Sequence, residues 1–352
     1  MLHLLTVLRE RLGKGQPLAL ATVVARKGSA PRGRGARLLA DASGLIHGTV
    51  GGGAAEAAVL EACAGVLRSG GSRLLDLALT NAMAAQEGMA CGGEVRVFVE
   101  CVSPDAKTRD FFAALAAAFH HAALHDGGGV LLTRLAPGQG GSPERTLYTQ
   151  GCFTGAPLGE RAEKAFLAAL SPRGDLSESA EHSLDGELFF AEPLVPPSRM
   201  LIAGAGHVAV PTAELAAFAG FSVHVIDDRP EFSRPERFPR ADATHTAPDF
   251  ADCLAGFTPD ARTYVVIITR GHMHDGTVLA QALRTQAGYI GMIGSRKKRE
   301  TVYAAMRELG FTEADLARIH CPVGLPIGAE TPEEIAVSIV AECIAHKRGK
   351  LA

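Results

Sequence analysis

The sequence predicts an α/β protein with two domains, of which the second is built on a doubly wound parallel sheet. Its 352 residues are enough for about two domains of ordinary size. Apolar residues make up 47% of the chain, enough to fill two cores, and 40 glycines suit a fold with many tight turns. A proline-rich link at 193–198 separates predicted domains at 1–195 and 196–352.

The parallel sheet is predicted by the stretch from Met200 to Asp227. An apolar run is followed by a glycine-rich turn, a helix of small residues and a second apolar run. This is the order of a nucleotide-binding βαβ unit, so we expect a Rossmann-like second domain. Gly204 permits the tight turn, Gly206 lets the backbone approach a pyrophosphate, and Asp227 is placed to accept hydrogen bonds from ribose hydroxyls.

The other elements of the first domain follow from shorter patterns. Apolar runs, buried or alternating, predict the strands, and Ala- and Leu-rich segments predict the helices. The expected strands are 17–25, 36–40, 73–79, 94–101 and 129–135, and the expected helices are the amphipathic start, 53–68 and 107–124. Residues 136–198 are weakly patterned, and we expect short strands, one helix and loops there. No internal repeat is apparent.

Further elements of the second domain include two buried strands, at 264–269 and 289–293. The last helix has a clear start signal. Thr331 is its predicted N-cap, Pro332 takes the first helical position, and Glu334 completes a capping box. Apolar residues then recur at a spacing of four and form the predicted buried stripe: Ile335, Ile339 and Cys343.

Composition excludes several classes of protein. A formal net charge of −3 argues against an extended nucleic-acid surface. No apolar run reaches the roughly 18–20 residues of a membrane span. The 7 cysteines are scattered and form no CxxC motif, which fits a reducing cytoplasm better than a disulfide framework. We therefore expect a cytoplasmic protein without nucleic-acid or membrane partners.

Two glycine-rich loops of the first domain are candidate anion sites. Residues 28–35 expose backbone amides beside Arg32, although a solvated, flexible turn explains them equally well. Residues 48–56 place three glycines at a helix start, where amides and dipole favour an anion, but the Lys-Ser/Thr of a Walker loop is missing. Glu56 is suited to bind N–H groups of a ligand, or simply matches the helix dipole.

Three further segments carry reactive or charged side chains. Cys91 lies between glycines, which favours an exposed thiolate for sulfur or metal chemistry, whereas most lone cysteines are small buried hydrophobes. Residues 269–275 contain His272 in an HxHD pattern but lack the other ligands of a metallohydrolase. This segment and the cationic run 294–299 follow predicted strands and should line the ligand crevice. The cationic run is also compatible with a solvated helix start.

Taken together, these segments resemble the XdhC/CoxI family, the maturation factors of xanthine dehydrogenase and related molybdenum hydroxylases. In the first domain the matching segments are GSAPRGRGARLL (28–39), GTVGGGAAE (48–56) and GMACGGEVRVFVE (88–100). In the second they are LIAGAGHVA (201–209), VIDDRPEFSRPERFP (225–239), YVVIITRGHMHD (264–275), YIGMIGSRKKR (289–299) and PVGLPIGAETPEEIAVSIVAE (322–342). The ordered set covers nearly the whole chain.

The resemblance implies a chaperone that binds the molybdenum cofactor (molybdopterin). Such a protein protects the cofactor while a cysteine desulfurase supplies the terminal sulfido ligand, and delivers it to an apo molybdenum hydroxylase of the xanthine dehydrogenase type. It also implies a homodimer, and Cys91 as the contact to molybdenum or sulfur. The implied cofactor-binding residues are Arg32, Gly52, Gly53, Glu56, Cys91, Gly92, Gly93, Gly204, Gly206, His207, Asp227, Ser295 and Arg296. Two residues depart from many relatives: Ala54 stands in place of a cysteine, and Arg270 in place of a histidine.

Two other functions remain open at this point. The βαβ unit and Asp227 fit an NAD(P)-dependent oxidoreductase, but the sequence offers no convincing proton donor for hydride transfer. A protein-binding adaptor without a small ligand is the third class. We expect an accessory protein rather than a catalyst, with its cofactor cleft between the glycine loops of the first domain and the carboxyl edge of the second domain's sheet. NAD(P) or another nucleotide is a further candidate ligand at that edge.

Overall fold

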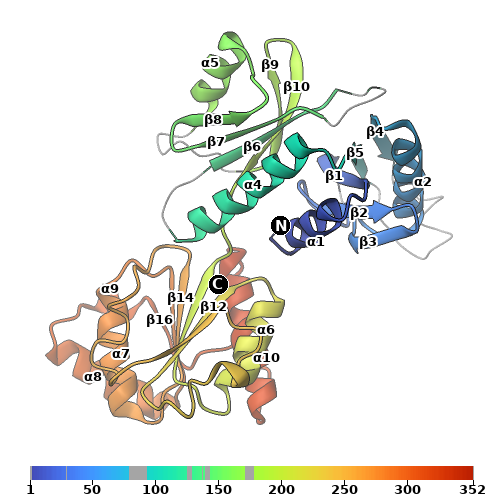
Figure 1. Cartoon of the computed structure of the whole chain (residues 1–352). Coiled ribbons are helices and arrows are strands. Elements are labelled where there is room, and N and C mark those ends of the chain that lie inside the picture. Colours follow the sequence, from blue (N-terminus) through green and yellow to red (C-terminus); the bar gives the residue numbers. More distant parts are fainter. Residues whose placement is uncertain are drawn as a thin grey trace. The chain divides into compact units, whose positions relative to one another are not determined.

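The computed structural model divides the chain into two compact units, residues 1–196 and 197–352 (Figure 1). It describes the residues 2–28, 30–78, 93–124, 129–136, 138, 143–170 and 178–351. Both units mix helices and strands, so the predicted α/β class is confirmed.

The first unit contains two antiparallel sheets. Its strands are β1 (Leu18–Lys27), β2 (Arg37–Asp41), β3 (Gly44–Gly48), β4 (Ser72–Ala78), β5 (Glu94–Val102), β6 (Gly129–Arg134), β7 (Arg145–Thr149), β8 (Cys152–Gly155), β9 (Ala180–Leu184) and β10 (Glu187–Pro193). One sheet has the order β3-β2-β1-β5-β4 and the other β8-β7-β6-β10-β9. The helices described in this unit are α1 (Leu2–Gly13), α2 (Gly53–Ser69), α4 (Ala106–Leu124) and α5 (Glu160–Ala169).

The two sheets belong to an internal repeat that the sequence does not reveal. The order α1-β1-β2-β3-α2-β4-β5 recurs as α4-β6-β7-β8-α5-β9-β10. The strand order of the first sheet becomes that of the second when every strand number is raised by five. We call residues 2–102 the first repeat and residues 106–193 the second repeat.

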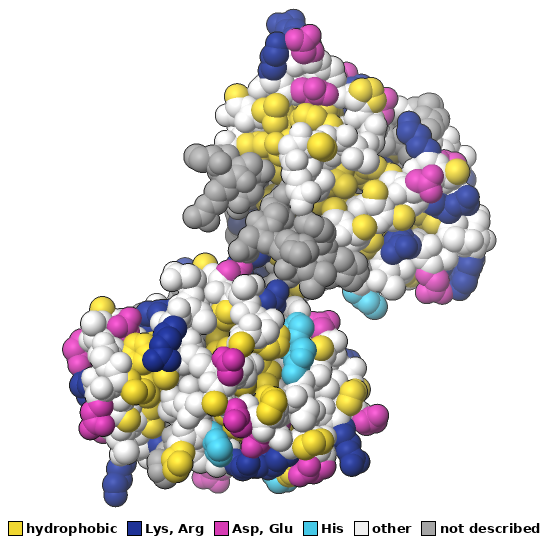
Figure 2. Space-filling view, turned by 60° about the vertical axis from the view of Figure 1, so that its left-hand side comes forward, with side chains coloured by type: hydrophobic (Ala, Val, Ile, Leu, Met, Phe, Trp, Pro, Cys, Tyr) yellow, Lys and Arg dark blue, Asp and Glu magenta, His cyan; other side chains and the backbone are white. Residues whose placement is uncertain are grey.

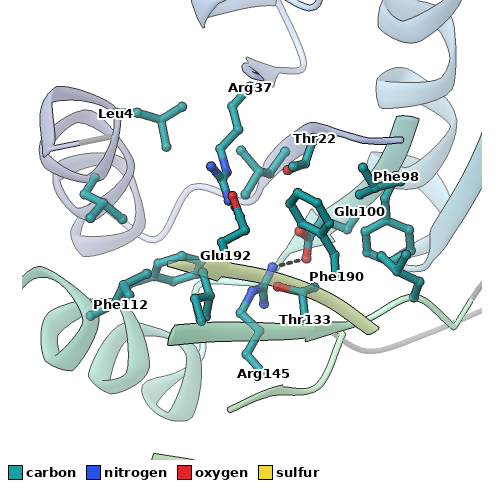
Figure 3. A pocket seen from close by; sticks show the side chains of 16 residues that line it. Leu4, Thr22, Arg37, Phe98, Glu100, Phe112, Thr133, Arg145, Phe190 and Glu192 are labelled. Atoms are coloured by element: carbon teal, nitrogen blue, oxygen red, sulfur yellow. Dashed lines mark hydrogen bonds and ion pairs between the residues drawn. The ribbon is translucent and has the colours of Figure 1, made fainter. Parts of the chain in front are cut away.

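Two buried ion pairs join the repeats. Arg37, at the start of β2, contacts Glu192 on β10, and Arg145, at the start of β7, contacts Glu100 on β5. The four side chains are only 2–9% exposed. Figure 3 shows both pairs beside a cavity of about 20 Å³, which has room for about one water molecule. The partners hold equivalent positions in the two repeats, so each repeat contributes one arginine and one glutamate to the contacts between them.

The second unit is built on a six-stranded parallel sheet. Its strands are β11 (Arg199–Ala203), β12 (Ser222–Asp227), β13 (Ala243–Thr246), β14 (Thr263–Ile267), β15 (Tyr289–Met292) and β16 (Ile319–His320). Their order, β13-β12-β11-β14-β15-β16, is the Rossmann order, which confirms the predicted doubly wound sheet. The strand order reverses between β11 and β14, and ligands of such sheets bind at the carboxyl ends of those two strands.

Helices cover both faces of this sheet. They are α6 (Ala209–Phe218), α7 (His272–Leu283), α8 (Arg296–Glu308), α9 (Glu313–Leu316) and α10 (Pro332–Lys347), with a 3₁₀ turn, η1, at Pro235–Arg237. Buried residues of α6 and α10 pack on one face, and those of α7 and α8 pack on the other (Figure 1). The predicted capping box of Thr331 and Glu334 is confirmed. Ile339 and Cys343 are fully buried and Ile335 is partly buried, as the predicted stripe requires.

Candidate functional site

The structure brings the two predicted anion loops of the first repeat together. Pro31, in the loop that joins β1 to β2, lies against Gly51, where an added Cβ would stand 2.7 Å from the Cγ atom of Pro31. Arg32 from the first loop and Thr49 from the second line one open pocket of about 350 Å³. Segments that are separate in the sequence therefore form a single candidate site.

The carboxylate of Glu56 occupies the backbone amides of its own loop. The backbone is left-handed at Gly51, Gly52 and Gly53, with φ of 148°, 80° and 60°. The Oε2 atom of Glu56 accepts hydrogen bonds from the N–H groups of Val50 and Gly52, at 3.3 and 3.2 Å, and from the Thr49 hydroxyl. Its other oxygen, Oε1, has no hydrogen-bond partner among the described residues. The loop thus engages Oε2 of the carboxylate and leaves Oε1 as an acceptor that no described residue uses.

Arg32 is the uncommitted cation of this pocket. It is exposed and forms no ion pair with any other described residue, whereas Arg37 is engaged by Glu192. His47 also lines the pocket, and burial, aided by the neighbouring His3, lowers its pKa. The imidazole of His47 is therefore neutral near pH 7, and Arg32 supplies the positive charge that an anionic ligand would meet.

The second repeat contains the same loop at the same length. Residues 48–56 (GTVGGGAAE) lie between β3 and the first turn of α2, and residues 155–163 (GAPLGERAE) lie between β8 and the first turn of α5. Gly48 and Gly155 have φ of 80° and 113°, and a Cβ there would stand 2.2 and 2.4 Å from the backbone oxygen of the arginine that begins the neighbouring strand. The two loops thus leave their sheets in the same way.

The hydrogen-bond network of Glu56 depends on residues that the second repeat lacks. Ala156 stands in place of Thr49 and has no hydroxyl. Pro157 stands in place of Val50 and has no N–H to donate. Glu163 holds the position of Glu56, but its loop offers neither donor. The network is therefore specific to the first repeat.

Part of the predicted site falls outside what can be described. Cys91 and Gly92 lie outside the described residues. Gly93 directly precedes β5, whose first residue, Glu94, pairs with Lys27 of β1. Gly93 therefore lies at the end of the sheet where β1 ends and the loop 28–35 begins.

In the second unit, the two glycines of the βαβ turn have different reasons to be glycine. Gly204 has a φ of 107°, and a Cβ there would stand 2.4 Å from the backbone oxygen of Ile268. At Gly206 an added Cβ would meet nothing within 4 Å, and the backbone is not left-handed. Packing within the unit thus requires Gly204 but not Gly206. His207, which follows, is exposed.

Asp227, the predicted ribose acceptor, is committed to its own loop. It is 1% exposed and accepts hydrogen bonds from the N–H of Ala205 at 2.7 Å and from that of Arg229 at 3.0 Å. The guanidinium of Arg229 contacts both oxygens, at 2.8 and 3.0 Å. Burial by itself would raise the pKa of this carboxyl, but these hydrogen bonds outweigh it and hold the pKa below its usual range. Asp227 thus stabilises the glycine turn, and both of its oxygens already accept hydrogen bonds.

The segments 269–275 and 294–299 are joined by a buried aspartate. Asp275 is fully buried and accepts hydrogen bonds from the N–H and hydroxyl of Thr269, at 3.1 and 2.5 Å, and from the Lys298 ammonium. Ser295 is the N-cap of α8 and accepts from the N–H of Lys298 at 3.2 Å. One cation of the predicted run is therefore neutralised within the unit. The side chains of His272 and Arg296 are not among those that the structure describes.

The described residues form no metal-binding cluster, and the face seen in Figure 2 has no basic patch. Among the described residues, no group of three or more His, Cys, Asp and Glu side chains could hold a metal ion. On the face seen in Figure 2, lysines and arginines alternate with acidic side chains instead of gathering into one patch. Within the described ranges, every helix is too short or too polar to cross a membrane.

Known protein families match parts of both units. The family described as the XdhC Rossmann domain matches residues 200–343, and the family described as XdhC and CoxI matches residues 12–78. A solved structure from Bacillus halodurans, described as a xanthine dehydrogenase, superposes with a TM-score of 0.78 at 24% identity. The superposition covers 99% of this chain and 96% of that one, and it shows a shared fold.

Curated relatives agree with this assignment. A probable xanthine dehydrogenase subunit of Bacillus subtilis (strain 168) is 28% identical over 97% of both chains. The uncharacterized protein YqeB of Escherichia coli (strain K12) is 35% identical over 149 residues, which are 42% of this chain and 27% of YqeB. The molybdenum cofactor insertion chaperone PaoD of the same organism is 26% identical over 147 residues, 42% of this chain and 39% of PaoD. The chain thus spans about a quarter of YqeB and less than half of PaoD. From the two family matches and the full-length likeness, the chain belongs to the XdhC and CoxI family.

Proposed function

We propose that this protein binds the molybdenum cofactor and acts as a maturation chaperone for a molybdenum hydroxylase of the xanthine dehydrogenase type. Family membership and the likeness to PaoD support this role. The structural observation that carries it is the arrangement of Glu56: its Oε2 atom is held by three donors, and its Oε1 atom is left without a partner among the described residues.

The pocket of the first repeat fits the chemistry of this cargo. A pterin ring presents N–H donors, which a fixed carboxylate oxygen of Glu56 can accept. The cofactor's phosphate is an anion, which the exposed guanidinium of Arg32 can pair with. Gly52 has open space where a Cβ would stand, so a flat ring can approach the backbone there. Together these groups would hold the cargo by its two polar ends.

The finer steps of maturation rest on the family. In this proposal the sulfur atom of Cys91 contacts the cargo's molybdenum or sulfur during the exchange of an oxo for a sulfido ligand, in which a cysteine desulfurase is the sulfur source and the oxo leaves as water. The chain hosts this exchange and then passes the cofactor to the apo-enzyme. It works in the cytoplasm as a homodimer. The scattered cysteines support the compartment, since no disulfide joins the six described ones.

Co-purification tests the proposal. The full chain, produced in a host that makes the cofactor, should carry molybdenum and the fluorescence of an oxidised pterin. It should also restore activity to an apo molybdenum hydroxylase in the presence of a cysteine desulfurase. Protein that carries neither metal nor pterin, and that leaves the apo-enzyme inactive, would contradict the proposed function.

An NAD(P)-dependent oxidoreductase is the alternative function. It is favoured by the Rossmann strand order and by Gly206, for which packing in the unit gives no reason. However, Asp227, on which this alternative depended for ribose binding, has both oxygens engaged. Hydride transfer between a nicotinamide cofactor and an added substrate in the presence of the purified chain, followed by the absorbance of the reduced nicotinamide, would support the alternative over the chaperone role.

A further inference from the structure

The carboxyl edge of the second unit's sheet holds an aspartate with an unused acceptor. Asp228 directly follows β12, and its side chain is 13% exposed. The Oδ2 atom accepts a hydrogen bond from Nη2 of Arg270 at 2.6 Å. The Oδ1 atom is buried and has no hydrogen-bond partner among the described residues, and the Nε atom of Arg229 lies 3.8 Å from it. Leaving a buried acceptor unsatisfied is unfavourable, so a missing donor is indicated.

The position of this aspartate points to a bound ligand as that donor. In the sheet, β12 and β14 lie on either side of β11. Asp228 follows β12 and Arg270 follows β14, so their ion pair crosses the carboxyl end of β11. The glycine turn of the βαβ unit begins at that end. This is the topological switch point, where open α/β sheets bind their ligands.

Gly206 gives independent support for a ligand at the same place. A Cβ on Gly206 would meet no described atom within 4 Å, and its φ is not left-handed. Neither packing nor backbone strain therefore explains the glycine. Close approach of an external group to the backbone explains it, and a diphosphate at a glycine turn makes such an approach.

We propose that the second unit binds a nucleotide with a free ribose and a diphosphate, and that Asp228, in place of Asp227, accepts from a ribose hydroxyl. The diphosphate lies over Gly206, and Arg270, which already holds Oδ2, adds positive charge beside it. A carboxylate can only accept, so a 2′-phosphate in place of the hydroxyl would offer no donor and would be repelled. The proposal does not depend on cofactor binding by the first unit.

The same chemistry is found in a nicotinamide dinucleotide and in a simple nucleoside diphosphate, and calorimetric titration distinguishes them. The full chain is titrated with NAD⁺, NADP⁺ and ADP. We expect NAD⁺ or ADP to bind, and NADP⁺ to bind at least about ten-fold more weakly than NAD⁺. Saturation by ADP at the affinity of NAD⁺ identifies a nucleoside diphosphate as sufficient, whereas binding by NAD⁺ alone identifies the dinucleotide.

Two substitutions with matched controls locate the site. Asp228→Asn turns one acceptor into a donor and should weaken binding at least about ten-fold, while Asp252→Asn removes the same charge from an exposed position and should not. Gly206→Ala should weaken binding with an unchanged melting temperature. Gly256→Ala, at an equally open position, should change neither.

Three results would overturn the inference. The first is that neither NAD⁺ nor ADP binds to the unaltered chain. The second is that NADP⁺ binds as tightly as NAD⁺. The third is that Gly206→Ala, or a folded Asp228→Asn protein, binds as the unaltered chain does. Thermal melting followed by circular dichroism shows whether the variants are folded, and Gly206→Ala decides the question if Asp228→Asn is not.

Discussion

The two repeats of the first unit share a scaffold but differ in the loop before their helices. Both begin the second strand of their sheet with an arginine that reaches the other repeat, and both leave the third strand through a glycine, Gly48 or Gly155, that packing requires. Only the first repeat surrounds its glutamate with donors. Both copies must satisfy the same folding requirements, so residues needed for the fold should occur in both. The shared scaffold does not require residues that occur in only one copy, so those residues are candidates for a specific function.

This comparison separates two interpretations of Glu56. Glu56 and Glu163 both occupy the fourth position of their helices, where an acidic side chain matches the helix dipole. That role is common to the two repeats. The network with Thr49, Val50 and Gly52, which holds the Glu56 carboxylate in place, is not. The dipole therefore explains why a glutamate is present at both positions, whereas only Glu56 is held by donors of its own loop.

Breaking either buried ion pair should have the largest effect on stability. Arg37→Ala and Arg145→Ala each leave a buried glutamate without its partner, which costs about 3–5 kcal/mol in the free energy of unfolding. Urea unfolding followed by circular dichroism measures this loss. Arg161→Ala removes an exposed pair, with Asp185, and should cost less than about 1 kcal/mol. A large loss at only one of the two buried pairs would break the equivalence of the repeats.

The glycines at the ends of β3 and β8 should be equally intolerant of a side chain. Gly48→Ala and Gly155→Ala would each place a Cβ against a backbone oxygen in left-handed backbone, which should cost about 2–4 kcal/mol. Gly13→Ala, where a Cβ meets nothing within 4 Å, serves as the control in the same unfolding assay. Unequal costs at Gly48 and Gly155 would show that the two loops differ in backbone as well as in side chains.

Making the first loop more like the second should have a moderate effect. Thr49→Ala copies Ala156 and removes one donor to the Glu56 carboxylate, at a cost of about 1.5 kcal/mol. Glu56 then becomes less firmly held, so the content of molybdenum and pterin in purified protein should also fall. Thr154→Ala, at an exposed position on β8, is the matched control and should leave the cofactor content unchanged.

Cysteine substitutions should affect stability least. Cys91→Ala should leave the melting temperature unchanged but lower the molybdenum content of the purified protein. Cys152→Ala removes an exposed thiol from the second repeat and should change neither quantity. Equal molybdenum content in the two variants would remove Cys91 from the proposed site.

Local patterns in the sequence predict local structure well in this chain. The glycine turn at 204–206 and the capping box of α10 depend on residues within one or two helical turns, and both appear as predicted. The internal repeat is not predictable in this way, because the copies share few side chains and their likeness lies in strand order. The pairing of Arg37 with Glu192 joins residues 155 positions apart, which no local pattern encodes.

The candidate sites show a similar limit. The sequence places Asp227 and Asp228 side by side, and the spacing alone favours Asp227 as the ribose acceptor. Only the fold shows that Asp227 is used by the N–H of Ala205 and by Arg229, whereas one oxygen of Asp228 accepts no hydrogen bond from any described residue. Likewise, the glycines at 51–53 predict an anion-binding loop, but not that Glu56 already occupies its amides.

The central claim, that Glu56 binds the cofactor, is tested most directly by comparing Glu56→Gln with Glu163→Gln. The carbonyl oxygen of a glutamine can keep the loop's three donors, while its NH₂ group replaces the free oxygen with a donor. The measurement is the molybdenum and pterin content of full-length protein purified from a cofactor-producing host. We predict that Glu56→Gln lowers this content at least about ten-fold at an unchanged melting temperature, and that Glu163→Gln leaves it as in the unaltered chain. Equal cofactor content in the two variants would contradict the account.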